Sequence, residues 1–130
     1  MSEYTKVNLK QVEDMAPKFG FAPYLESRFA ATELALEHSG ISHFKVAPDY
    51  RVPFGHRHAD QEEIYLVVRG SARIKLDDDI LEVGEWDAVR IPPQVTRGME
   101  GGPDGAEIVA FGAPRHGGND AEMVQDFWPA

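Results

Sequence analysis

Residues 55–63 read Gly55-His56-Arg57-His58-Ala59-Asp60-Gln61-Glu62-Glu63. On an extended strand, residues two apart point to the same side, so His56 and His58 present their imidazoles together, about 6.5 Å apart along the strand. Glu63 follows five residues after His58, and a short turn between them would return the chain beside it. Glu62 is the competing carboxylate. Glu63 is preferred because it leaves six residues before Gly70 and shares a strand face with Tyr65 and Val67. Two imidazoles and one carboxylate leave positions open on a divalent first-row metal, so the sequence predicts a metal site at His56, His58 and Glu63.

Outside this segment, the chain consists mainly of short apolar runs separated by Gly, Pro and Asp. These runs predict strands at 29–36, 41–47, 62–69, 72–76, 80–83, 86–91 and 107–112. No long helical pattern lies between them, so an antiparallel sandwich or barrel is expected rather than a parallel α/β sheet. A short helix or turn is expected at 8–16, where Leu9, Val12 and Met15 recur at helical spacing before Pro17.

The predicted strand at 62–69 has two apolar faces. Tyr65 and Val67 share one face with Glu63, while Ile64, Leu66 and Val68 fill the other. Something must cover the second face, and both the N-terminal segment and another subunit fit that role. A homodimer is therefore an expected state of the protein.

In this central region the chain resembles the cupin family, whose first motif reads His-x-His, three or four residues, Glu, six residues, Gly. His56, His58, Glu63 and Gly70 fit the motif, whereas Tyr50 stands where the family has an opening glycine. The resemblance covers about residues 28–113. It implies an all-β, double-stranded β-helix or jelly-roll barrel with a short N-terminal helical segment. The barrel would comprise residues 28–130, and residues 1–27 would pack on it or on a partner subunit. The resemblance further implies that the motif side chains point inward and hold a divalent transition metal such as Fe, Mn, Zn, Ni or Cu.

The second cupin motif is degenerate. Aligned on Pro92, it keeps only this proline, and Arg97 stands where a metal-binding histidine is expected. An arginine is permanently cationic and cannot ligate a metal. In one outcome Arg97 turns outward or pairs with a bound anion, and the three-ligand metal site persists. In the other, Arg97 reaches Glu63 and an internal ion pair replaces the metal.

Several further residues are candidates for binding a ligand in the barrel. Tyr65, Phe54 and Trp86 are expected to line a pocket together with Phe44 and Phe111, and Arg97 is expected to orient an anionic ligand. Such aromatic residues more often form the core. His43 and His116 are conceivable substitute metal ligands, but neither shows ligand spacing, so both are interpreted as ordinary surface or structural histidines.

Composition and charge limit the partners. The chain has 130 residues, with 13 Lys and Arg against 22 Asp and Glu, and its formal charge is −9. This acidity disfavours nucleic acid and anionic membranes as partners. Absence of cysteine excludes disulfides, Cys-based zinc sites and thiol nucleophiles. No signal peptide or membrane span is evident, so a cytoplasmic location is expected.

Two functions fit these observations. One is a small-molecule-binding cupin with a divalent metal, Fe, Mn, Zn or Ni, acting as an oxygenase or isomerase on a small organic acid. The other is a non-catalytic ligand-binding or sensory cupin that has lost the metal. The same barrel hosts both classes of protein, so the fold alone does not choose between them.

Overall fold

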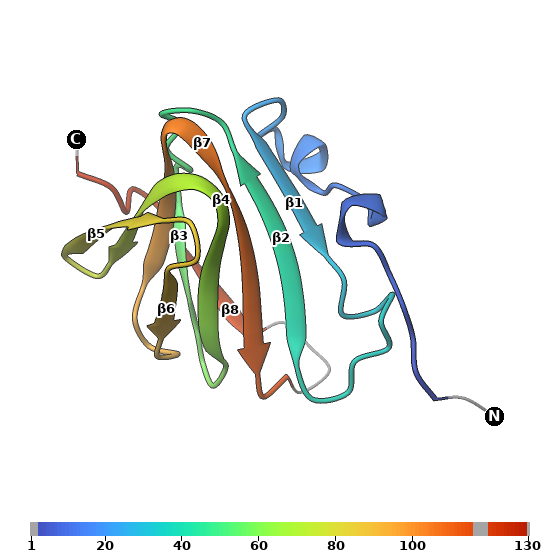
Figure 1. Cartoon of the computed structure of the whole chain (residues 1–130). Coiled ribbons are helices and arrows are strands. Elements are labelled where there is room, and N and C mark those ends of the chain that lie inside the picture. Colours follow the sequence, from blue (N-terminus) through green and yellow to red (C-terminus); the bar gives the residue numbers. More distant parts are fainter. Residues whose placement is uncertain (1–2, 116–119, 130) are drawn as a thin grey trace.

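The computed structural model describes residues 3–115 and 120–129, which form a curled antiparallel barrel preceded by two short 3₁₀ helices (Figure 1). The helices are η1 (Leu9–Gln11) and η2 (Ala16–Phe19). The strands are β1 (Leu25–Phe29), β2 (Gly40–Val46), β3 (Gly55–His58), β4 (Glu62–Leu76), β5 (Asp79–Gly84), β6 (Ala88–Ile91), β7 (Arg97–Ala113) and β8 (Ala121–Val124). The expected all-β jelly-roll barrel with a short N-terminal helical segment is confirmed.

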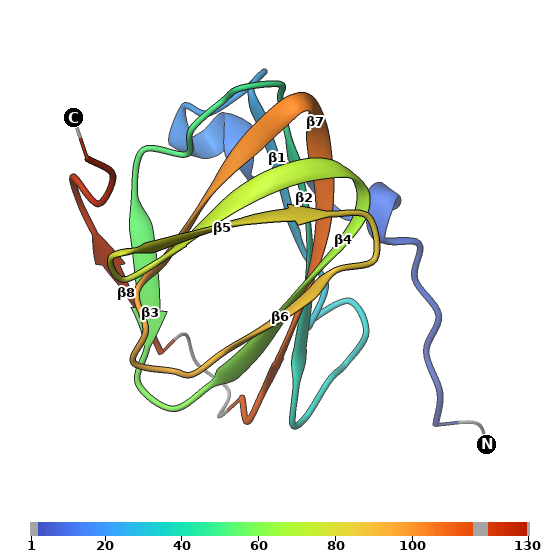
Figure 2. The same cartoon turned by 60° about the vertical axis from the view of Figure 1, so that its left-hand side comes forward.

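Two long strands, β4 and β7, pair with each other and belong to both layers of the barrel. The first half of β4 pairs with β6 and with the second half of β7, which in turn pairs with β2 and so with β1. The second half of β4 pairs with β5 and with the first half of β7, which meets β3, and β3 pairs with β8. Figure 2 shows β4, β5 and β6 curling across the front while β3 and β8 close one side.

The bend that lets β4 serve both layers occurs at Gly70. This glycine has a φ of +73°, and the pairing of β4 with β7 shifts register on either side of it. A Cβ at Gly70 would collide with the carbonyl oxygen of Gly105, which itself has a φ of +76°. Only glycine accepts both the positive φ and the close backbone approach, so the glycine that ends the first motif has a structural cause.

The core lies between the two layers. Its most buried members include Tyr65 and Val67 on β4, Ile91 on β6 and Ile108 on β7, each at most 1% exposed. Ile64, which points the other way along β4, is 42% exposed. The prediction of two apolar faces on this strand therefore describes one core face and one outer face.

The N-terminal segment packs on the outside of the barrel near β1 and β2. Val12 and Ala16 are buried, and the carboxylate of Asp14 accepts hydrogen bonds from the backbone N–H groups of Ala16 and Ser27. Strand β1 begins at Leu25, slightly before the expected start of the barrel. No helix among the described residues is long and apolar enough to cross a membrane.

The predicted strand at 29–36 is wrong apart from its first residue. The chain leaves β1 after Phe29 and forms successive turns, in which the N–H groups of Leu34 and Leu36 bond the carbonyls of Ala30 and Ala31. Alanine, leucine and glutamate favour turns of helix over strands, which explains this local structure. The expected strands at 62–69 and 72–76 are a single bent strand, β4.

Three strand regions were not predicted: residues 25–28 of β1, the first half of β7 and all of β8. The first half of β7 contains Gly98, Gly101, Gly102 and Gly105, and glycine normally disfavours a strand. Here close packing requires it, because a Cβ at Gly101 would collide with the carbonyl oxygen of Ala47.

Candidate metal centre

The three predicted ligands come together inside the barrel. His56 and His58 lie on β3, and Glu63 lies near the start of β4, just after the connecting turn. β3 does not pair with β4, because its neighbours are β7 and β8. Glu63 therefore reaches the imidazoles from the other layer of the barrel. The sequence spacing had instead indicated a strand adjacent to the histidines.

The ligand atoms of these residues converge. Nε2 of His58 lies 3.2 Å from Oε1 of Glu63, and Nε2 of His56 lies 3.5 Å from the same oxygen. One ligand atom from each of the three residues lies within 4.8 Å of the other two. The two imidazole rings meet edge to face with centroids 5.1 Å apart. This is a compact cluster of two nitrogens and one oxygen that could hold a metal ion.

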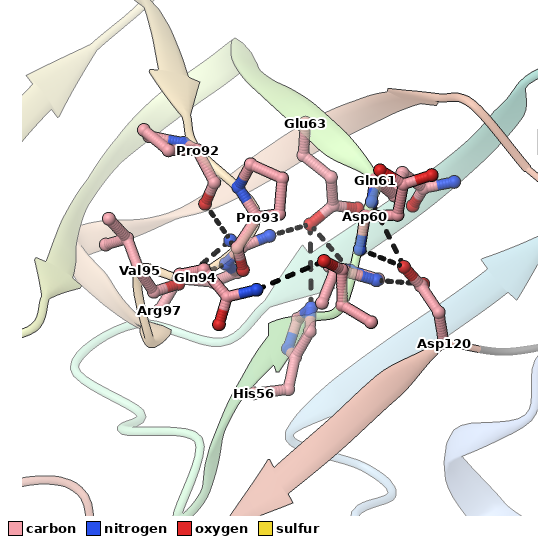
Figure 3. Close-up of polar contacts among 12 residues, drawn as sticks. His56, Asp60, Gln61, Glu63, Pro92, Pro93, Gln94, Val95, Arg97 and Asp120 are labelled. Carbon is pink, nitrogen blue, oxygen red and sulfur yellow. Dashed lines mark hydrogen bonds and ion pairs between the residues drawn. The ribbon is translucent and has the colours of Figure 1, made fainter.

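Asp120 orients the ring of His58. Its Oδ1 lies 2.6 Å from Nδ1 of His58, and its Oδ2 accepts hydrogen bonds from the backbone N–H groups of Asp60 and Gln61 (Figure 3). Nε2 of His58 is buried and has no hydrogen-bond partner among the described residues. Metal-binding histidines usually donate their other ring N–H to a carboxylate, a backbone carbonyl or water, and the contact between Nδ1 of His58 and Asp120 is of this kind.

Arg97 is fully buried beside the cluster. Its Nη1 donates to Oε1 of Glu63 at 2.6 Å, and Nη2 donates to the carbonyls of Pro92 at 2.7 Å and Val95 at 2.8 Å (Figure 3). Of the two outcomes expected for Arg97, the outward-turned side chain is wrong, and the internal ion pair with Glu63 is present. The guanidinium is committed to Glu63 and to the turn between β6 and β7, which argues against the expected role in orienting an anionic ligand.

The charges around Glu63 hold it ionised. Burial alone would raise the pKa of Glu63, but the imidazoles of His56 and His58 outweigh this and hold that pKa well below its usual range. Burial alone would lower the pKa of His58, but the carboxylates of Glu63 and Asp120 outweigh this effect and raise that pKa above its usual value. The pKa of Asp120 is lowered to about 2. Burial alone would raise this pKa, but the hydrogen bonds from His58 and from the backbone lower it by more.

The donor set fits a divalent transition metal. It combines two imidazoles with a carboxylate, and the buried Nε2 of His58 has no other partner in the described part of the chain. The contacts of Glu63 with His56, His58 and Arg97 that define the cluster are made through Oε1. The positive charge of Arg97 opposes a cation at this oxygen.

The structure places the remaining predicted site residues as follows. Tyr65 is fully buried on the same face of β4 as Glu63, and its hydroxyl has no partner among residues 3–115 and 120–129. Phe54 is half-buried, packs on Phe21 with ring centroids 5.2 Å apart and contacts the core. Trp86 lies in the turn between β5 and β6 and is 71% exposed, so the structure does not bring it to the cluster.

The other candidates are dispersed. Phe44 packs against the core, whereas Phe111 is 40% exposed on the outer face of β7. His43 is buried and pairs with Glu107 at 2.9 Å, away from the three ligands, in keeping with its interpretation as a structural histidine. His116 lies outside the described residues. Asp120 was missed by the sequence analysis, since it follows the region that resembles cupins and no local motif marks it.

Comparison with known proteins confirms the fold. No protein-family model matches the chain. A cupin protein of Bacteroides fragilis, BF4112, superposes with a TM-score of 0.72 over 92% of this chain and 91% of its own, at 22% identity. A deletion mutant of the oxalate decarboxylase OxdC of Bacillus subtilis gives a TM-score of 0.77 over 96% of this chain and 32% of its own, at 18% identity.

By sequence, the chain is 30% identical over 71 residues to the uncharacterized protein MJ1618 of Methanocaldococcus jannaschii. The match covers 54% of this chain and 57% of that protein, so it spans little more than half of the relative. The structural likenesses show the fold: the chain forms a barrel of the cupin type. Within this barrel, the chain carries a His-His-Glu cluster of metal-ligand type and an arginine paired with its carboxylate.

Proposed function

We propose that this protein is a small-molecule-binding cupin that holds one divalent transition metal, Fe, Mn, Zn or Ni, at His56, His58 and Glu63. The observation that carries this proposal is the convergence of both imidazoles on one carboxylate oxygen: Nε2 of His58 and Nε2 of His56 lie 3.2 and 3.5 Å from Oε1 of Glu63, while Asp120 holds Nδ1 of His58. A metal ion at this point would bind donors that the fold already places together.

A bound metal would supply a Lewis acid with positions open to a substrate oxygen or to dioxygen, as expected of an oxygenase or isomerase. The residues of the chain then have distinct roles. His56 and His58 contribute neutral nitrogens, and Glu63 contributes the negative charge. Since Arg97 is committed to Glu63 and to backbone carbonyls, a small organic acid would bind through the open metal positions and not through this arginine.

The alternative function is a metal-free cupin that binds a ligand without catalysis. The ion pair between Arg97 and Glu63, 2.6 Å long and fully buried on the arginine side, favours this alternative. In that protein Arg97 would supply the positive charge that a metal otherwise brings to Glu63. Both functions predict the same fold, so metal content separates them.

The test is elemental analysis of protein purified without chelator from metal-replete medium. About one metal per chain is expected, with His56→Ala and His58→Ala reducing it to background. His43→Ala is the matched control, because His43 is also a buried histidine paired with a glutamate, and it should leave metal content unchanged. Wild-type protein that carries no metal and takes up none of the four ions on reconstitution would overturn the proposal in favour of the metal-free cupin.

We also propose that two copies associate through the outer face of β2, β7 and β4. Ile41, Phe111 and Ile64 are in register across these strands, and Ile64 and Phe111 are 42% and 40% exposed. They line a hollow of about 350 Å³ together with Leu34 and Leu36. At its border Arg90 pairs with Glu62 at 2.8 Å, so the charge of Glu62 is balanced beside the apolar residues.

Light scattering tests this association. Wild-type protein should have the mass of a dimer, and Ile64→Glu should have that of a monomer. Leu81→Glu is the control, because Leu81 is similarly exposed, at 41%, but lies on β5. A monomeric wild-type protein would exclude the dimer.

A further inference from the structure

Asp120 lies at the junction between the C-terminal strand and the candidate metal centre. It immediately precedes β8, which pairs with β3 in a register that sets Ala121 opposite His58 and Val124 opposite Gly55. Asp120 is therefore one residue beyond the partner of His58. From this position its carboxylate reaches Nδ1 of His58 at 2.6 Å.

The carboxylate of Asp120 is itself fixed on its other side. Oδ2 accepts the backbone N–H groups of Asp60 at 2.9 Å and Gln61 at 3.0 Å, both in the turn that leads from β3 to β4. One side chain thus ties β8, the ring of His58 and the turn that leads to Glu63. Three hydrogen bonds leave the carboxylate little freedom to rotate, so the direction it imposes on the imidazole is well defined.

We propose that Asp120 is a positioning residue of the metal centre, which holds His58 in the tautomer with the proton on Nδ1 and so directs the lone pair of Nε2 toward Glu63. The inference rests on the proposed function as far as the metal is concerned. It adds a residue from outside the region of cupin resemblance and makes the C-terminal strand a part of the site. Because a carboxylate accepts and cannot donate, only Nδ1–H satisfies it, and the neutral ring then has its lone pair on Nε2.

A second carboxylate on β8 supplies the matched control. Glu122 pairs with Arg57 at 2.8 Å across the same two strands, but both side chains are on the outside, 65% and 40% exposed. Asp120 and Glu122 therefore both join β8 to β3, one directed to a candidate ligand and the other to the surface. Glu122 controls for the loss of a carboxylate between these two strands.

The first experiment is a competition titration with a chromophoric chelator and Zn²⁺ as the probe. Asp120→Asn preserves the size of the side chain but replaces one acceptor oxygen with a donor. Its affinity for Zn²⁺ should fall about 10- to 100-fold, the usual effect of removing the outer partner of a metal-binding histidine. Glu122→Gln should change affinity less than about twofold. Equal losses in the two variants, or an unchanged affinity in Asp120→Asn, would overturn the proposal.

The second experiment separates this inference from the proposed function. In the metal-free wild-type protein, ¹⁵N NMR of the His58 ring, at a pH where the ring is neutral, should show the proton on Nδ1. Asp120→Asn should abolish this preference, while Glu122→Gln should retain it. If the wild-type protein binds no metal but shows this tautomer, the proposed function fails and the positioning role stands. A wild-type ring with its proton on Nε2 would overturn the positioning role, even if Asp120→Asn does not fold.

Discussion

The protein contains two buried His–Glu pairs, one inside the barrel and one on its outside. Inside, His58 and His56 face Glu63, whose carboxylate also pairs with Arg97. Outside, His43 on β2 faces Glu107 on β7, whose carboxylate also pairs with Lys10 from the N-terminal segment. Residue types are nearly the same, so the arrangement around each pair must decide what it does.

Three features distinguish the two pairs. The inner carboxylate faces a second imidazole, whereas the only histidine paired with Glu107 among the described residues is His43. Nε2 of His43 is 2.9 Å from Glu107 in a hydrogen bond, whereas Nε2 of His58 lacks such a bond among the described residues. The inner cation is completely buried, while the side chain of Lys10 is 66% exposed. A His–Glu pair therefore becomes a ligand set only where nitrogens converge on one point.

The largest expected difference between the two pairs is in the free energy of unfolding that is lost when the charge of Glu63 or of Glu107 is removed. Glu63→Gln leaves Arg97 buried without its counter-ion, which should lower the free energy of unfolding by about 3–5 kcal/mol. Glu107→Gln leaves Lys10 free to turn into water, so its effect should be no more than about 1 kcal/mol. Urea unfolding of the metal-free variants measures both values. Similar losses would show that the burial of Arg97 does not set the energy of the inner pair.

A smaller effect is expected when the inner cation is exchanged for a ligand. Arg97 is opposite His56 in the pairing of β7 with β3, so Arg97→His places a fourth donor next to the cluster and removes the opposing charge. Affinity for Zn²⁺ should rise at least about tenfold, because a like charge near the ion is lost and a nitrogen is gained.

The matched variant for that experiment is Lys10→Gln, which removes the cation that pairs with Glu107 and adds no imidazole. It should not create a metal site, since His43 is the only histidine paired with Glu107 among the described residues. Chelator competition measures both variants. Unchanged affinity in Arg97→His would indicate that residue 97 does not control access of the metal to Glu63.

The smallest effect concerns acid stability of the outer pair. Burial raises the pKa of Glu107, but Lys10 and His43 outweigh it and hold the pKa below the ordinary value of 4.5. The unfolded chain then binds a proton more readily than the folded one. The contribution of Glu107 is complete above about pH 4.5 and is lost as the pH falls through the folded pKa. Urea unfolding between about pH 7 and about pH 3 should show a shallower acid limb for Glu107→Gln than for the wild-type protein.

The sequence was sufficient to predict the fold and the three candidate ligands, because each depends on local spacing. His56 and His58 alternate on one strand, and Gly70 marks the bend that β4 requires. The fate of Arg97 was left open between two outcomes, since it depends on which carbonyls a distant turn presents. Asp120 could not be found, because its contact with His58 spans 62 residues and is set only by the register of β8 on β3.

The pairing of β3 also governs when the site can form during folding. Its partners, β7 and β8, begin at Arg97 and Ala121, so the strand that carries both histidines cannot complete its hydrogen bonds until most of the chain has been synthesised. Strands joined over such separations close slowly, because the entropy of the intervening loop is lost before the contacts form. We therefore expect β1 and β2 to pair early. The two imidazoles should be among the last groups to reach their final positions, on the millisecond-to-second scale of barrels with non-local pairing.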